Sequence, residues 1–190
     1  KPKVAHAAGE LVVDVLRRGV TARQLITGRS IENAIAAIAT SGGSTNGVLH
    51  LLALAKEAGV ELDIDRFGEI SAATPLTCDL KPGGRYNAVD LYAAGGVPLV
   101  ARRLDELGRL HRDAPTVDGR TIGEVADAAE EATGQDVVRP AASPIKPNGG
   151  LAILRGNLAP EGCVVKLAGH DRRRHQGPAR VFDGEEAAMA

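Results

Sequence analysis

The sequence predicts an α/β protein that is mainly helical up to about residue 134 and contains short β-strands after residue 150. In the first part, apolar residues recur every three to four positions, which is the spacing of amphipathic helices. Beyond residue 150, short runs rich in Val, Ile and Leu alternate with Gly and Pro turns, which is typical of strands. Residues 139–150 hold three prolines and two glycines, and so favour neither helix nor central strand.

The first helix is predicted from an apolar stripe that ends near Gly19, a residue suited to a helix C-terminus. The stripe consists of Ala8, Leu11, Val12, Val15 and Leu16. Thr21 and Gln24 have capping-box spacing and predict a short second helix. Ser30 is expected to cap a third helix. The apolar face of this third helix consists of Ile31, Ala34, Ile35 and Ile38.

Five further helices are predicted, separated by glycine-rich or proline-rich turns. They cover residues 48–58, 64–70, 87–95, 98–107 and 121–134. Pro98 suits the first residue of the fourth of these helices. Thr121 and Glu124 form a second capping box, which begins the fifth.

The change of pattern near residue 150 predicts two domains. We expect residues 1–138 to belong to one domain, residues 139–150 to be a linker, and residues 151–190 to begin a second domain. Strands are predicted over residues 151–154, 163–167 and 179–182. The chain has no initiating Met and ends inside a helical pattern, so we expect it to be a piece of a longer protein.

Composition excludes several classes of function. With 23 basic and 24 acidic side chains, the formal net charge is -1, which argues against a role in coating nucleic acid or binding a membrane surface. No apolar run approaches the ~20 residues that span a bilayer. Two cysteines are too few for a disulfide framework and favour a reducing compartment, so we expect a cytoplasmic location.

The stretch SGGSTNG at residues 41–47 is the most informative for chemistry. Its glycines let a ligand approach the backbone closely, and the loop leads into a helix N-terminus, where free N–H groups favour an anion. Ser44, Thr45 and Asn46 add hydroxyl and amide donors at the same place. A plain turn between helices, with Ser44 or Thr45 as the N-cap, explains the same pattern. The loop is not a P-loop, because no Gly-Lys-Ser/Thr follows.

Other polar groups give weaker signals. Asp79, Lys81 and Arg85 surround a turn that either orients a carboxylate or phosphate or is simply solvated. The five histidines show no metal-ligand spacing with a matching acid, and the polar run at residues 170–175 is predicted to be an exposed loop. Cys78 and Cys163 have no CxxC partner, so we expect each to be a buried or half-buried free thiol.

Several long blocks of the sequence resemble the dihydroxy-acid dehydratase/phosphogluconate dehydratase family, in the family's order. The blocks are residues 41–53, 73–86, 95–98, 148–162, 164–166 and 177–183. This resemblance implies that residues 1–138 are the C-terminal part of the family's α/β domain. Residues 151–190 would begin its β-barrel-like C-terminal domain, with the active site between the two domains.

The resemblance also implies an activity. Members of this family are homodimeric hydro-lyases that depend on an iron–sulfur cluster and Mg²⁺. They remove water from a 2,3-dihydroxy acid, and the resulting enol becomes a 2-keto acid. The cluster iron would act as a Lewis acid on the departing 3-hydroxyl, while Mg²⁺ would hold the carboxylate and the 2-hydroxyl. The expected partner is therefore a small dihydroxy acid, with neither nucleic acid nor membrane.

The sequence departs from the family pattern in one important way. The family's cluster cysteines, Mg²⁺ ligands, modified lysine and catalytic serine belong to motifs that this chain does not contain. We therefore expect no catalytic and no metal-binding residue here, cofactor ligands that lie outside this chain, and an isolated chain that is inactive and binds no cofactor. Only Ser44, Thr45 and Asn46 are expected near the substrate.

The choice among substrates depends on two blocks. Residues 79–84 and 157–162 resemble the branched-chain dihydroxy-acid members, which serve valine and isoleucine biosynthesis, more than the phosphogluconate members. A dehydratase for a sugar acid (a pentonate or phosphogluconate) is the alternative. A non-catalytic anion-binding or scaffold module that kept the fold is the alternative from a different class.

Overall fold

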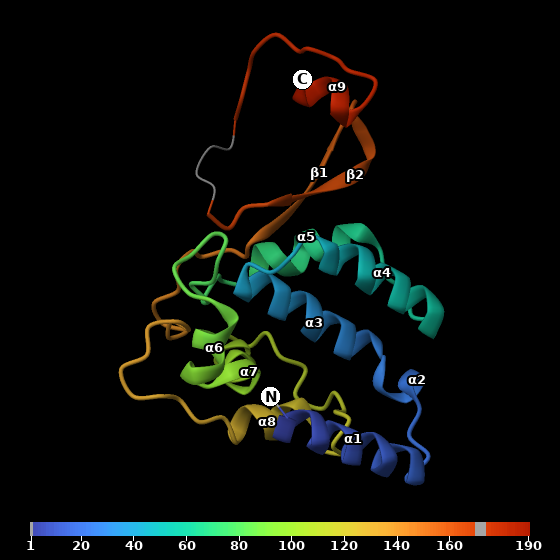
Figure 1. The fold of residues 1–190 in the computed structure, drawn as a ribbon, viewed down its shortest axis with the longest axis vertical. Helices are drawn as coiled ribbons and strands as arrows, with labels where there is room; N and C mark the ends of the chain where they lie inside the picture. Colours follow the sequence, from blue (N-terminus) through green and yellow to red (C-terminus); the bar gives the residue numbers. More distant parts are fainter. Residues whose placement is uncertain (1, 170–173) are drawn as a thin grey trace.

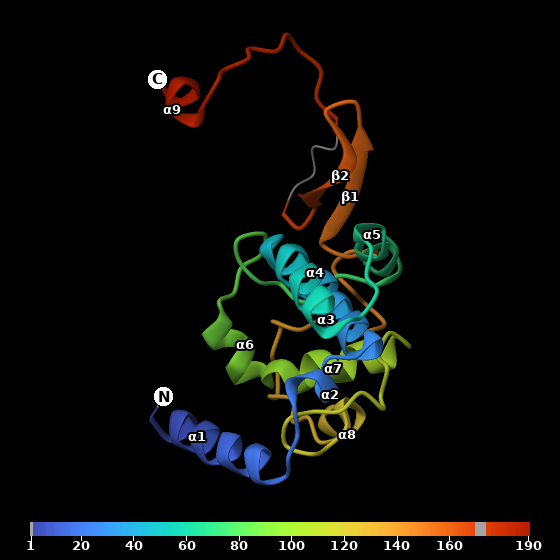
Figure 2. The ribbon, with the colours of Figure 1, turned by 90° about the vertical axis from the view of Figure 1, so that its right-hand side faces the viewer.

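The structure, a computed structural model, describes residues 2–169 and 174–190. A group of helices forms the larger part, and a β-hairpin projects from it (Figures 1 and 2). In chain order the elements are α1 (Pro2–Arg17), α2 (Ala22–Leu25), α3 (Gly28–Ser41), α4 (Asn46–Ala58), α5 (Ile64–Ala73), α6 (Ala88–Ala94), α7 (Gly96–Glu106), α8 (Ile122–Asp127), β1 (Leu151–Gly156), β2 (Ala159–Lys166) and α9 (Glu185–Met189). The fold is mixed α/β and mainly helical, as the sequence predicts.

Helix α3 lies at the centre of the helical part and packs against α4, α5 and α7. One buried cluster joins α3 to α4, α5 and β1. It consists of Ile31, Ile35, Val48, Ala55, Phe67 and Leu151. A second cluster joins α3 to α6 and α7. It consists of Ala36, Cys78, Ala94, Leu99, Val100, Leu104, Val137 and Val138. Because α3 contributes to both clusters, its C-terminal end, where the 41–47 loop begins, is held from two sides.

The beginning of α3 differs from the prediction. Thr27, not Ser30, is the N-cap: its Oγ1 accepts a hydrogen bond from Ser30 N at 3.1 Å, and Ser30 Oγ accepts one from Thr27 N at 2.8 Å. The helix therefore begins one turn earlier than predicted. The two predicted capping boxes, Thr21 with Gln24 and Thr121 with Glu124, are confirmed.

Two helix boundaries in the second half were also predicted incorrectly. Helix α7 begins at Gly96, so Pro98 lies within its first turn rather than at its first residue. Helix α8 ends at Asp127 and does not continue to Gly134. The physical reason is Arg102 on α7. Its guanidinium donates hydrogen bonds to the carbonyl oxygens of Ala126 and Asp127 (both at 3.2 Å), which have no partner within the helix when α8 ends here.

Helix α1 stands apart from the other helices (Figure 2). It has no buried residue. Within the apolar stripe that predicted it, Leu11 and Val15 are half-buried and the other residues are exposed; Leu16, for example, is 78% exposed. No helix in the described residues is both long and apolar enough to cross a membrane.

The hairpin forms from the first two predicted strands. β1 and β2 pair antiparallel, with Leu151 opposite Lys166 and Ile153 opposite Val164. β2 begins at Ala159, earlier than predicted, because the turn after Gly156 is tight. The predicted strand over residues 179–182 does not form: these residues are exposed and pair with no strand in the part of the chain that is described. A short run of this kind becomes a strand only when it pairs with another strand.

Residues 139–150 connect the helices to the hairpin and are hydrogen-bonded near both ends. Arg139 N donates to Thr77 O at 2.9 Å, and Leu76 N donates to Lys146 O at 3.0 Å. Gly149 N then donates to Ser71 O at 2.7 Å, which directs the chain into β1 against α5. The segment contains neither helix nor extended strand, but its path is determined by α5 and by the residues that follow α5.

Candidate functional site

The 41–47 loop joins α3 to α4. Its first glycine, Gly42, ends α3 with φ +60°, a left-handed conformation that glycine adopts without strain. Gly43 N donates to Ile38 O at 2.9 Å, which closes the last turn of α3. Gly47 is needed for a different reason: a Cβ there would lie 2.6 Å from Ile38 Cδ1. The glycines therefore make a tight turn between two helices.

The structure brings the three predicted site residues together but gives them different roles. Ser44 is exposed, and its Oγ accepts a hydrogen bond from Asn46 N at 3.2 Å. Thr45 is half-buried and occupies the N-cap position, yet its side chain makes no capping bond. Within the described residues, the side chains of Thr45 and Asn46 have no hydrogen-bond partner. Ser44 is thus part of the turn, whereas the turn does not use the side chains of Thr45 and Asn46.

The backbone at this helix end is less open than the sequence suggests. Gly47 N donates to Ser44 O at 3.0 Å, and Val48 N donates to Thr45 O at 3.1 Å. Together with the bond to Ser44 Oγ, these contacts use the N–H groups of the first three residues of α4. The expectation of free N–H groups for an anion is therefore wrong, and the donors that remain are side chains.

A buried pair of threonines fixes the end of α3, from which the 41–47 loop starts. Thr40 and Thr77 are both fully buried, and their hydroxyl oxygens lie 2.9 Å apart. Thr40 Oγ1 also donates to Pro75 O at 2.8 Å, and Thr77 N donates to Thr40 O at 2.9 Å. These bonds join the last turn of α3 to residues 75–77.

Glycine contacts beside the loop bring together three blocks of the sequence. A Cβ at Gly150 would lie 2.7 Å from Gly42 Cα, and a Cβ at Gly83 would lie 2.8 Å from the carbonyl carbon of Ala168. Next to this contact is a cavity of about 300 Å³, whose lining includes Ser41, Cys78, Asp79, Gly83, Lys146 and Ala168. Ser41, at the start of the 41–47 loop, therefore borders a cavity large enough for a small organic acid, whereas Ser44, Thr45 and Asn46 are not among the residues that line it.

The acid and base of the 79–85 turn are paired with each other. Arg85 donates to the Asp79 carboxylate and, through Nη2, to Asp136 Oδ2 at 2.6 Å. The bonds to Asp136 and Asp79 raise the pKa of Arg85, and the bonds from Arg85 and Arg139 hold the pKa of Asp136 below its usual range. This geometry favours a structural role for Arg85.

The thiols and histidines that the structure describes provide no metal site. Cys78 is buried, and burial raises the pKa of its thiol to about 11. Cys163 is exposed, because its position on β2 faces solvent. The expectation of a buried or half-buried thiol is therefore wrong for Cys163. No group of three or more His, Cys, Asp or Glu side chains in the described residues could hold a metal ion. Of the polar run at 170–175, residues 170–173 lie outside the described residues, and His175 is exposed.

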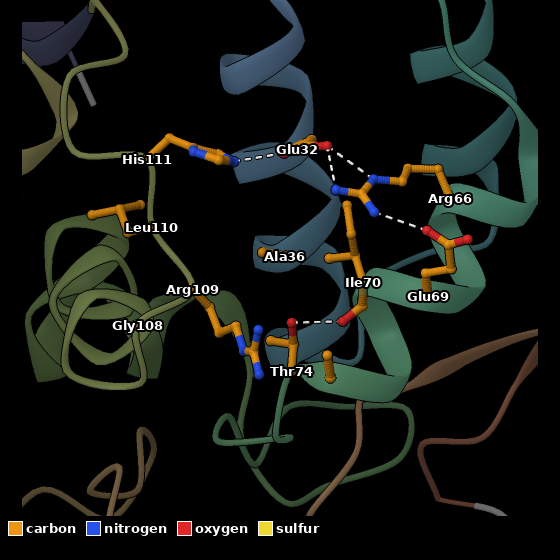
Figure 3. Close-up of a pocket in the computed structure, with 11 residues that line it drawn as sticks. Glu32, Ala36, Arg66, Glu69, Ile70, Thr74, Gly108, Arg109, Leu110 and His111 are labelled. Atoms are coloured by element: carbon orange, nitrogen blue, oxygen red, sulfur yellow. Dashed lines mark hydrogen bonds and ion pairs between the residues drawn. The ribbon is translucent and has the colours of Figure 1, made fainter.

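A second cavity, of about 270 Å³, lies between α3, α5 and the segment after α7 (Figure 3). Along one side of it, Glu32 Oε1 accepts hydrogen bonds from Arg66 Nε (2.9 Å) and Nη2 (2.6 Å), and Glu32 Oε2 lies 2.6 Å from His111 Nε2. Arg66 Nη1 also donates to Glu69 at 2.8 Å. No sequence pattern indicates this cluster, because its members come from three distant segments with no recurring spacing.

Glu32 should make the stability of the chain depend on pH. Burial raises the pKa of Glu32, but hydrogen bonds and charge interactions from Arg66 and His111 outweigh this effect and hold it below the usual value. Its stabilising contribution is therefore fully present above the pKa of an ordinary glutamate, ~4.3, and is lost as the pH falls through the lower folded value. We expect Glu32→Gln to reduce the free energy of unfolding by roughly 1 kcal/mol at pH 7 and by much less in acid.

Urea denaturation at pH 7 and at acidic pH measures this difference. Glu57→Gln, on the exposed face of α4, is the matched control and should change little at either pH. An equal loss for Glu32→Gln at both pH values would show that the ion pairs contribute nothing through the charge of Glu32.

Known proteins are similar to this chain over all of its 190 residues. Residues 1–125 match the family model described as dihydroxy-acid/6-phosphogluconate dehydratase N-terminal, and residues 136–190 match the corresponding C-terminal model. Over all 190 residues the chain is 60% identical to a protein of a Roseiflexus species, 58% identical to one of Koribacter versatilis and 50% identical to one of Thermus thermophilus. Each of these relatives is named dihydroxy-acid dehydratase, and the chain spans about a third of their length (33–34%).

Proposed function

The chain belongs to the dihydroxy-acid/6-phosphogluconate dehydratase family, and we propose that the whole protein removes water from a 2,3-dihydroxy acid to give a 2-keto acid. The observation that carries this proposal is the 50–60% identity, over the full 190 residues, to proteins named dihydroxy-acid dehydratase. The preferred substrate is a branched-chain dihydroxy acid of valine and isoleucine biosynthesis. A sugar acid is the second candidate.

The reaction breaks the C2–H bond and the C3–O bond of the substrate. The 3-hydroxyl leaves with a proton as water, and the electron pair of the C2–H bond forms the double bond of an enol. The enol then takes a proton from solvent at C3, loses the proton of its 2-hydroxyl to solvent, and becomes the 2-keto acid. Groups that orient the carboxylate throughout this sequence lower the entropic part of the barrier.

The 41–47 loop supplies such groups in this proposal. The Thr45 hydroxyl and the Asn46 amide have no partner in the described part of the chain and lie at the start of a 13-residue helix. Both can donate to a carboxylate oxygen. We assign them to substrate orientation, and assign Ser44 to holding the turn.

The cofactors of this proposal come from outside the chain. Cys78 and Cys163 are free thiols in separate places, and the side chains that the structure describes form no metal-binding group. Among residues 2–169 and 174–190, no group of side chains fits an iron–sulfur cluster or Mg²⁺, and we assign the ligands of both to other segments of the protein. The same proposal includes a homodimer in the cytoplasm, with a small dihydroxy acid as the ligand and no nucleic acid.

A substrate panel tests the function. We expect the protein expressed from its complete gene and purified without oxygen to form a 2-keto acid from 2,3-dihydroxy-3-methylbutanoate, with kcat/KM at least tenfold above that for xylonate or 6-phosphogluconate. The 190-residue chain alone is the negative control and should form none. A preference for a sugar acid would support the second candidate, and no activity with any of the acids would support a non-catalytic module.

A further inference from the structure

The cavity shown in Figure 3 has two chemically different ends. Glu32, Arg66 and Glu69 form the ionic cluster at one end, and Arg109 extends into the other end, beside Thr74. The wall between the two ends is apolar. It is formed by Ala36, Ile70, Ala73 and Leu110. The volume of the cavity, about 270 Å³, is sufficient for a small organic molecule.

The charges at the two ends are balanced differently. At the first end, Arg66 is shared between the carboxylates of Glu32 and Glu69, and Glu32 also contacts His111. At the second end, the Arg109 guanidinium has no hydrogen bond or ion pair with any other residue that the structure describes. Its backbone is held by a bond from Arg109 N to Leu104 O at 2.7 Å, so the side chain starts from a defined position.

The floor near Arg109 offers no competing acid. Thr74 is fully buried, and its hydroxyl donates to Ile70 O at 2.7 Å. The Glu69 and Glu32 carboxylates lie with Arg66 at the opposite end (Figure 3). An anion brought to Arg109 would therefore meet a guanidinium and an apolar wall.

We propose that this cavity binds a short aliphatic monocarboxylate, with its carboxylate on Arg109 and its hydrocarbon part against Ala36, Ile70 and Leu110. A guanidinium matches the two oxygens of a carboxylate with two parallel hydrogen bonds. The apolar wall adds contact area that acetate is too small to use. A dicarboxylate is disfavoured, because its second carboxylate would point toward Glu32 and Glu69. This site is separate from the 41–47 loop and does not rest on the dehydratase activity.

Ligand-observed NMR titrations on the protein expressed from its complete gene test this site, with isobutyrate as the probe. We expect saturable binding of isobutyrate that is at least tenfold weaker in Arg109→Gln and is partly kept in Arg109→Lys. Arg23→Gln, an exposed arginine on α2, is the matched control and should bind as the parent does. Asn46→Ala should also bind isobutyrate normally, which separates this cavity from the loop. Acetate and succinate should both bind more weakly than isobutyrate.

Three results would overturn the proposal: no saturable binding, equal binding by Arg109→Gln, or succinate binding as tightly as isobutyrate. Arg109 also lies beside the carboxyl end of α5, where a cation stabilises the helix dipole. If that were its only role, Arg109→Gln would lower the melting temperature and leave isobutyrate binding unchanged.

Discussion

Asn46→Ala and Thr45→Val in the whole enzyme are expected to lower kcat/KM by roughly 10- to 150-fold each, because each loses a donor to the charged carboxylate of the substrate, worth about 1.5–3 kcal/mol. Both side chains lack a partner among the described residues, so their loss should change the melting temperature little. Steady-state kinetics and thermal unfolding of the same preparations measure the two effects.

Ser44→Ala is the control within the same loop. Ser44 Oγ accepts the hydrogen bond from Asn46 N, so its removal should cost about 1 kcal/mol of stability, the contribution of one hydrogen bond, and leave the kinetics of the folded enzyme nearly unchanged. If all three variants were destabilised with unchanged kcat/KM, the 41–47 loop would be a turn without a role in substrate binding.

Arg103→Met is expected to destabilise the chain by about 3 kcal/mol. Arg103 is 5% exposed, and its guanidinium donates to Glu131 Oε1 at 2.6 Å, to Glu106 Oε1 at 3.1 Å and to Arg139 O at 3.2 Å. Methionine would fill much of the volume, but it would leave these acceptors without their donor. The loss should also raise the pKa of Glu131: burial raises that pKa, and the bonds from Arg103 and Gln135 currently hold it below its usual range.

Arg29→Met provides the comparison, since Arg29 pairs with Asp113 on the surface with both side chains more than 60% exposed. An exposed pair of this kind contributes about 0–1 kcal/mol. Urea denaturation of the two variants should therefore differ by about 2 kcal/mol or more. Equal, small losses would mean that the segment beginning at Arg139 is not held by Arg103.

Local signals explain which parts of the fold could be predicted from the sequence. The capping boxes at Thr21 and Thr121 are formed by residues three positions apart, so their chemistry is visible in the sequence. The N-cap of α3 was predicted at Ser30 and lies at Thr27; both residue types suit an N-cap, and only their position relative to the rest of α3 decides between them. The end of α8 depends on hydrogen bonds from Arg102, which lies on α7, before the loop that leads to α8. No local sequence pattern indicates that contact.

For the candidate site, the sequence identified the loop but not its surroundings. Glycine spacing identified the 41–47 loop, and its closeness to Gly83 and Gly150 followed only from the fold. The sequence could not show that Ser44 O and Thr45 O accept the N–H groups of Gly47 and Val48, which removes the expected backbone anion site. The Glu32, Arg66 and His111 cluster was not predictable either, since tertiary packing alone brings these residues together.

The most direct test of the proposed activity is the reaction in D₂O followed by NMR. Dehydration of 2,3-dihydroxy-3-methylbutanoate through an enol predicts that the first product molecules carry one deuterium at C3. The purified 2-keto acid, kept in D₂O without enzyme for the same time, corrects for slow exchange. Enzyme-dependent formation of the 2-keto acid with deuterium at C3 would support the account. A product that carries at C3 the hydrogen moved there from C2 of the substrate, or no product at all, would contradict it.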